Sequence, residues 1–235
     1  MNAFRRSRCG GCALTLNNVR VIARVSGALW IPEARTLAAG DLHFEKGSAY
    51  GARGQLLPPY DTLVTLERLE VEASALKPER LVLMGDSFHD HGAVARLTGM
   101  AIDRICALAG GLDLVWLAGN HDPAPPEGLP GSVAPYLEVA GLTLTHEPQD
   151  RPEAGEVAGH LHPVATVAGY GERVRRRCFL TDGIRMVLPA FGAYAGGLNV
   201  VDPALAGLFQ TPPTALILGD DRVHAASWDR LSRGR

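Results

Sequence analysis

The sequence predicts an α/β fold with two β-sheets. In the first half of the 235-residue chain, apolar runs alternate with two amphipathic helical patterns, and strands joined through helices pair in parallel with right-handed crossovers. In the second half, apolar runs follow one another with little helical signal. These later runs are therefore expected to form a second sheet that packs on the first.

Strands are expected where short apolar runs are bounded by turn residues. Some of these runs flank the helical patterns, and the others lie in the second half of the chain. The expected strands are Thr36–Gly40, Arg80–Met84, Leu112–Ala118, Leu142–Thr145, Val157–Gly159, Arg173–Leu180, Arg185–Leu188 and Ala215–Gly219.

Helices are expected over Tyr60–Leu76 and Ala93–Ala109, where apolar residues recur at a spacing of three or four. Asp61 is placed to cap the first helix. Gly110 and Gly111 follow the second helix and are expected to end it.

The composition is that of a globular protein with a substantial core, since 46% of residues are hydrophobic and 20% are charged. We expect a single domain over residues 1–235, with residues 1–13 as a flexible tail. No apolar run is long enough to span a membrane, and the N-terminus lacks a signal-peptide core, so we expect a cytoplasmic protein. The net charge of −2 gives no overall basic surplus for binding nucleic acid.

The cysteines are too few for a disulfide scaffold in a chain of this length. Cys9 and Cys12 have the spacing of a zinc knuckle, but no second pair completes four ligands. We therefore place them in the tail. Cys106 falls within an apolar helical pattern and is expected in the core.

Residues that bind metals follow several of the expected strands. Asp41, Asp86 and Asn120 come after the first, second and third strands, at the ends where α/β sheets bind ligands. Asp41 and His43 are two residues apart, as are His160 and His162. In extended backbone each pair would project to one side and could bind one ion.

These residue types together indicate a site for two metal ions. The carboxylate of Asp86 can bridge two cations, Asn120 offers a neutral oxygen, and His146 adds an imidazole. This mixture favours Mn(II), with Fe, Zn and Mg as alternatives. Two such ions hold a phosphate ester and activate a hydroxide near neutral pH. Each motif alone is weak, and the order and placement of the whole set lead to the prediction.

The motifs resemble those of the calcineurin-like metallophosphoesterase superfamily. The resemblance covers residues 37–163 and implies a four-layer α/β/β/α sandwich of two mixed β-sheets flanked by helices. It implies that the first ion is bound by Asp41, His43, Asp86 and His162, and the second by Asp86, Asn120, His146 and His160. It also implies that His121 is not a ligand and stands near the leaving oxygen, as general acid or transition-state stabiliser. The sequence departs from the family at His89, which is followed by Asp90, so either residue could orient His121.

A narrower resemblance, over about residues 40–202, is to the bacterial ligase-associated DNA damage response endonucleases of the PdeM type. It depends on Leu42–Gly47, Leu57–Thr62, Gly85–Asp90, His146–Pro148, Gly159–Pro163 and Leu188–Asn199. It implies a DNA-cutting phosphodiesterase in DNA repair, acting on single strands. It further implies an ATP-dependent DNA ligase, a helicase and an exonuclease as partners.

Some residues outside the ligand set are candidates for substrate binding. His89 and Asp90 could contact substrate. Arg173, Arg175 and Arg177 would share one strand face, which either contacts phosphates or is simply solvated. Phe191 and Tyr194 could stack on bases, and for Phe191 core packing is the alternative. Lys46 either contacts phosphate or forms a surface ion pair.

The sequence leaves three functions open. The first is a metal-dependent DNA phosphodiesterase, and the second is an enzyme for a small or nucleotide phosphoester, which the acidic pI favours. The third is a non-catalytic, metal-stabilised repair scaffold. His121 is not needed to bind metal, so its presence argues for turnover.

Overall fold

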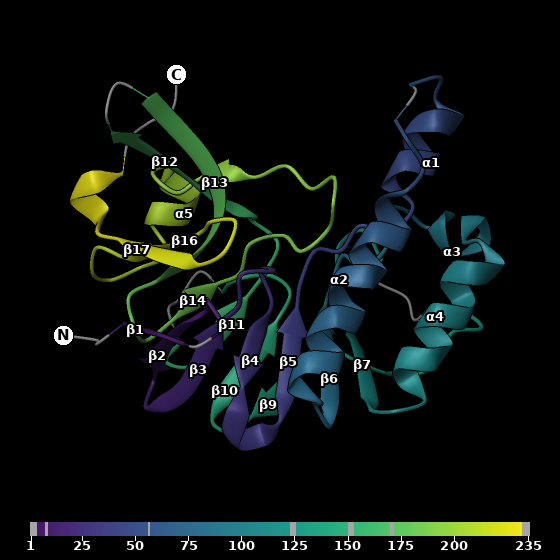
Figure 1. Ribbon diagram of the computed structural model, residues 1–235, viewed down its shortest axis with the longest axis horizontal. Helices are drawn as coiled ribbons and strands as arrows, with labels where there is room; N and C mark the ends of the chain where they lie inside the picture. The colour runs from purple at the N-terminus through teal and green to yellow at the C-terminus, as the bar shows by residue number, and fades with distance from the viewer. Residues whose placement is uncertain are drawn as a thin grey trace.

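The computed structural model describes residues 4–7, 9–55, 57–122, 126–149, 153–169 and 172–231. It contains two mixed β-sheets, with helices α1–α4 gathered on one side of the first sheet (Figure 1). The expected α/β fold with two sheets is therefore confirmed.

The first sheet has eight strands within the described residues, in the order β1-β2-β3-β4-β5-β6-β7-β8. Strands β5 to β8 pair in parallel, as the alternation of strands and helices predicted. Strands β1 to β5 form an antiparallel meander. The strands are β1 (Arg5–Arg6), β2 (Cys12–Leu16), β3 (Val19–Ala23), β4 (Leu29–Ile31), β5 (Thr36–Ala39), β6 (Arg80–Met84), β7 (Asp113–Leu117) and β8 (Ser132–Ala134).

The second sheet runs in the order β15-β12-β13-β14-β11-β10-β9, and β16 joins it through β13. Strands β10, β11 and β14 are parallel neighbours. The strands are β9 (Tyr136–Val139), β10 (Leu142–Thr145), β11 (Glu156–Ala158), β12 (Pro163–Gly169), β13 (Glu172–Thr181), β14 (Met186–Val187), β15 (Leu198–Asn199), β16 (Thr214–Leu218) and β17 (Val223–Ala226).

Each of the two expected helices differs from the structure in one respect, and α1 and α5 were not expected. The expected helix over Ala93–Ala109 is two helices, because Leu97 is extended and the Thr98 side chain accepts a hydrogen bond from the Ala101 N–H. Asp61 does not cap α2; its carboxylate accepts a hydrogen bond from the Gly47 N–H and links α1 to α2. The helices are α1 (Lys46–Ala52), α2 (Asp61–Leu76), α3 (Ala93–Arg96), α4 (Gly99–Ala109) and α5 (Pro203–Ala206), with 3-10 turns at Pro32–Ala34 and Trp228–Arg230.

Alternating side chains divide the core into layers, because successive residues of a strand point to opposite faces. In β6, Val82 and Met84 join the core between the two sheets, whereas Leu81 and Leu83 pack toward α2 and α4. In β13, Phe179 faces that same central core, and Leu180 packs on the outer face with Leu205 of α5. The layers are therefore helix, sheet, sheet and the short helix α5.

The expected N-terminal tail is part of the first sheet in its described residues. Cys12 opens β2 and is buried in the central core, and β1 pairs with β2. Cys9 is exposed. Cys106 was expected in the core and is instead exposed on α4, because it lies on the outward side of that helix.

No helix among the described residues is long and apolar enough to cross a membrane.

Candidate metal centre

The loops that carry the expected ligands meet at the carboxyl ends of parallel strands. Asp41, Asp86 and Asn120 follow β5, β6 and β7, while His146 and His160 follow β10 and β11 of the second sheet. Backbone hydrogen bonds connect these loops: the Asp41 N–H donates to Gly85 O (3.1 Å), and the Gly159 N–H donates to His146 O (2.9 Å). Two sheets thus contribute to one centre.

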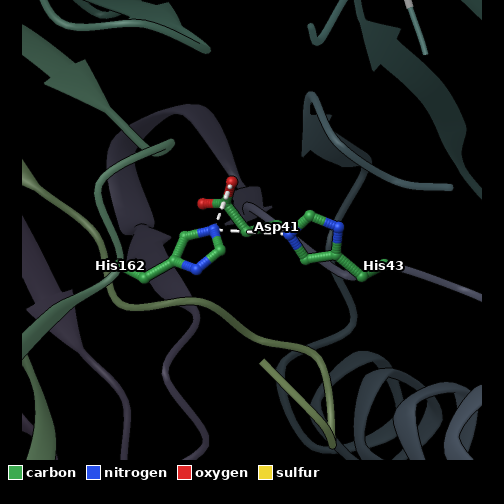
Figure 2. Close-up of side chains that lie close together, drawn as sticks. All are labelled: Asp41, His43 and His162. Carbon is green, nitrogen blue, oxygen red and sulfur yellow. Dashed lines mark hydrogen bonds and ion pairs between the residues drawn. The ribbon is translucent and has the colours of Figure 1, made fainter. Parts of the chain in front are cut away.

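Asp41, His43 and His162 form the first cluster of candidate ligands (Figure 2). One ligand atom from each lies within 4.8 Å of the others. His162 Nε2 is 3.0 Å from Asp41 Oδ1 and 3.4 Å from His43 Nε2. Burial and the nearby His162 lower the pKa of His43 to about 3, so His43 is neutral and can offer a lone pair to a metal.

Asp86, His146 and His160 form the second cluster, again with ligand atoms within 4.8 Å of one another. Asn120 belongs with them, because its Oδ1 lies 2.9 Å from both His146 Nε2 and His160 Nδ1. His146 Nε2 is 3.4 Å from Asp86 Oδ1. All seven residues expected to bind metal are therefore brought together.

The charge environment of His146 fits a cation. Burial alone would lower the pKa of His146, but its hydrogen bond to Asp86 and the charges of Asp41 and Asp86 raise that pKa to about 9. The centre therefore favours positive charge at this ring. His146 Nδ1 lies 3.0 Å from Met84 O, a contact that orients the ring with Nε2 toward Asn120 and Asp86. The two clusters fit two divalent metal ions.

Charges from both clusters influence the pKa of the Asp86 carboxyl. Burial would raise the pKa of its carboxyl, but hydrogen bonds from His146 and the His121 N–H, with the charges of His146 and His43, hold it at about 2. Its carboxylate is therefore ionised and interacts with both clusters. The bridging role of Asp86 stays a prediction.

The backbone of the ligand loops is not extended, which corrects the geometry expected for the Asp-x-His and His-x-His pairs. Asp41, His43, Asp86, His160 and His162 all have φ between 46° and 66°. Residues other than glycine rarely adopt this left-handed conformation, and strained backbone is concentrated at functional sites. Asp41 and His43 converge on the first cluster because both residues turn within a loop. His160 and His162 instead divide between the clusters, with His162 in the first and His160 in the second, which corrects the expectation that this pair binds one ion.

Two glycines allow the ligand loops to approach one another. A Cβ at Gly85 would lie 2.5 Å from the His146 ring, and Gly85 also has a φ of 78°. A Cβ at Gly159 would lie 2.6 Å from Asp41 Oδ2. The glycine that precedes a ligand motif thus makes room for a ligand of another motif.

His121 lies beside the clusters without joining either. Its side chain is 42% exposed, its Nε2 is 4.0 Å from Asp86 Oδ2, and its Nδ1 is 3.0 Å from His89 O. The His89 ring stacks on it, with ring centroids 5.7 Å apart. Asp90 instead forms an ion pair with Arg96 at 2.9 Å. Of the two candidates to orient His121, His89 therefore makes the contacts.

The sequence analysis gave Asp122 no role, yet it supports the loop after Asp86. Asp122 Oδ2 accepts hydrogen bonds from the backbone N–H groups of Ser87 (2.7 Å) and Phe88 (3.1 Å). Burial and the nearby Asp86 raise the pKa of Asp122 to about 6, although those two hydrogen bonds oppose the rise. The only hint of this role in the sequence was the position of Asp122, two residues after the expected ligand Asn120.

The expected substrate-binding arginines differ in their surroundings. Arg173 is exposed, and Arg175 donates a hydrogen bond to Gly197 O (2.7 Å). Arg175 also lines a cavity of about 300 Å³. Arg177 is largely withdrawn from solvent and donates to Ala190 O (2.7 Å) and Phe191 O (3.3 Å).

Of the two aromatic residues considered for base stacking, Phe191 is fully buried in the helix-side core. Tyr194 donates a hydrogen bond to Pro58 O (2.9 Å).

The comparisons support the fold. No protein-family model and no curated protein matches the sequence. The structure is similar to that of Pseudomonas putida nuclease MPE, with a TM-score of 0.69 and 24% identity, over 92% of this chain and 100% of that one. A weaker likeness is to Yfce, a phosphoesterase from E. coli, with a TM-score of 0.40 and 17% identity, over 82% and 98% of the two chains. The likeness to the Pseudomonas putida structure confirms the fold expected from the sequence, a sandwich of two mixed β-sheets flanked by helices.

Proposed function

We propose that this protein is a metal-dependent phosphodiesterase that cuts single-stranded DNA as an endonuclease in repair. The observation that carries the proposal is the pair of clusters, Asp41 with His43 and His162, and Asp86 with His146 and His160, in one centre. The structurally similar Pseudomonas putida protein is a nuclease, which supports a nucleic acid as substrate. The choice of DNA comes from the sequence resemblance. The proposal includes the expected repair partners: an ATP-dependent ligase, a helicase and an exonuclease.

In this proposal Asp41, His43, Asp86 and His162 hold one divalent ion, and Asp86, Asn120, His146 and His160 hold the other. The native metal proposed is Mn(II). When bound, two such ions would stabilise charge on the phosphate and lower the pKa of a water, so that it could lose a proton and attack as hydroxide.

The role of His121 follows from its contacts. With Nδ1–H donating to His89 O, the other ring nitrogen is left for the substrate. A protonated His121 would donate its Nε2 proton to the leaving oxygen, and the His89 ring would hold it in orientation.

A second candidate is an enzyme for a small or nucleotide phosphoester. The net charge of −2 favours it, because polynucleotide binding benefits from a basic surface. Both candidate functions use the same metal centre. They differ in the openness of the site and in the basic surface that they need near it.

The test is to incubate the protein with Mn(II) and compare single-stranded DNA, bis-p-nitrophenyl phosphate and p-nitrophenyl phosphate. Strand cutting supports the proposal, whereas activity on the small diester alone supports the second candidate. Bound ions without hydrolysis of any substrate would indicate a scaffold. A His121→Ala preparation, purified in parallel, controls for contaminating nuclease.

A further inference from the structure

One face of α1 carries two cations and an aromatic ring. Lys46, Tyr50 and Arg53, the residue that ends the helix, follow one another at spacings of four and three, so they share a face. Gly47 and Ala49 are buried. Arg53 is exposed, while Lys46 and Tyr50 are half-buried.

This face adjoins the metal centre. The segment that follows the first ligand pair runs beside the segment that follows Asp86, since the His89 N–H donates to Phe44 O (3.0 Å). The Tyr50 ring lies 5.9 Å from the His89 ring, which in turn stacks on His121. The positive charges of Lys46 and Arg53 both act on the His89 ring.

The two cations are not neutralised in the way their neighbours are. Arg96 pairs with Asp90, and Arg104 pairs with Glu70. No described residue forms an ion pair or hydrogen bond with the side chain of Lys46 or Arg53. Asp61 attracts Lys46, but its carboxylate already accepts a hydrogen bond from the Gly47 N–H. Positive charge thus remains beside the centre of a protein whose net charge is −2.

We propose that Lys46, Tyr50 and Arg53, with His89, form a subsite for the nucleotide next to the scissile phosphate. Lys46 would contact the scissile phosphate, Tyr50 and His89 would contact the neighbouring base or sugar, and Arg53 would contact the next phosphate. Lys46 and Arg53 are about 10 Å apart along the helix axis, so they can meet different phosphates of one strand. This inference rests on the proposed function. It narrows the substrate of the enzyme to a polynucleotide strand that has a second phosphate next to the scissile one.

The kinetic test compares Arg53→Gln and Tyr50→Leu with the unaltered protein, in Mn(II), on a thymidine oligonucleotide and on bis-p-nitrophenyl phosphate. We expect the ratio of kcat/KM for the oligonucleotide to kcat/KM for the small diester to fall about tenfold in each variant. Arg53→Gln should also lower the salt dependence of oligonucleotide KM by about one charge. The matched control is Arg80→Gln, because Arg80 begins β6 at the end opposite Asp86.

A binding test separates this inference from the proposed function. In the His121→Ala background, fluorescence anisotropy with a labelled thymidine oligonucleotide should show about tenfold weaker binding when Arg53→Gln is added. If that difference appears but only the small diester is hydrolysed, the proposed function fails, and the four residues stand only as an oligonucleotide-binding site. Equal oligonucleotide affinity with and without Arg53→Gln, or equal losses on both substrates, would overturn the subsite.

Discussion

The two ligand clusters differ in how their side chains are held. In the second cluster, His146 Nδ1 contacts Met84 O, and Asn120 Oδ1 lies 2.9 Å from two imidazoles. In the first cluster, the buried Nδ1 of His43 has no hydrogen-bond partner among the described residues. The Nε2 atoms of His43 and His162 face each other at 3.4 Å.

This difference indicates that hydrogen bonds within the protein fix the side-chain orientations of the second cluster. In the first cluster, the orientation of the His43 ring depends more on a bound ion. Hydrogen bonds from outside a ligand set fix ring orientation and raise metal affinity. A histidine without such a bond is oriented only by packing. We therefore expect the second cluster to bind its ion more tightly than the first.

The largest effect should come from Asp86→Asn, because it removes the charge that both clusters share. An amide is a weak ligand and cannot offset two cations. We expect loss of both ions, or at least of the second, and a fall in activity of about a thousandfold or more. Metal content by mass spectrometry and turnover of bis-p-nitrophenyl phosphate measure this, with circular dichroism to check folding. Full activity with two bound ions would contradict the shared role.

His121→Ala should separate chemistry from metal binding, since His121 belongs to neither cluster. We expect both ions to remain and kcat to fall about 10²–10⁴-fold, the usual contribution of a general acid. His91→Ala is the matched control, because His91 is an exposed histidine two residues after His89. Loss of an ion in His121→Ala would show that His121 is a ligand instead.

Much of this centre could be predicted because its ligands follow strands with clear apolar patterns. The strands Arg80–Met84 and Leu142–Thr145 were predicted with the bounds that the structure has. Once parallel strands are placed, their carboxyl ends bring Asp86 and its counterparts to one edge. Residue order therefore predicted one shared centre, whereas the division of its ligands into two clusters was implied only by the family resemblance.

The local backbone could not be predicted in the same way. Left-handed φ values at residues such as Asp41 and His160 arise because loops from two sheets restrain one another, and no pattern within either loop encodes this. Strands β2 and β3 were missed although a signal existed. Asn17 and Asn18 have φ values of 44° and 67°, which suit a two-residue hairpin turn.

Metal titration of the two clusters measures their difference directly. We expect Mn(II) to bind the unaltered protein in two steps whose Kd values differ about 10–100-fold. His146→Ala should remove the tighter step, and His43→Ala the weaker one. Isothermal titration calorimetry of chelator-treated protein distinguishes these outcomes. Two equal steps, or loss of the tighter step in His43→Ala, would contradict the expectation that the second cluster binds its ion more tightly.

The smallest effect concerns Asp122, a carboxyl beside the second cluster. Burial and the nearby Asp86 raise its pKa from 3.8 to about 6 in the folded protein. The folded state therefore binds this proton more tightly than the unfolded state, and the free energy of unfolding falls as pH rises from about 4 to 6. In Asp122→Asn this slope is absent, while the amide oxygen can still accept from the Ser87 and Phe88 N–H groups.

For metal-free protein we accordingly expect Asp122→Asn to match the unaltered protein near pH 4 and to exceed it by about 1–2 kcal/mol at pH 7. Urea unfolding at a series of pH values measures the difference, and Asp103→Asn on the exposed side of α4 is the control. Bound metal should reduce the gain, because an ion that neutralises Asp86 removes part of the repulsion that raises the Asp122 pKa. If the difference in free energy of unfolding does not depend on pH, Asp122 affects stability through its hydrogen bonds alone. Its charge then does not interact measurably with the second cluster.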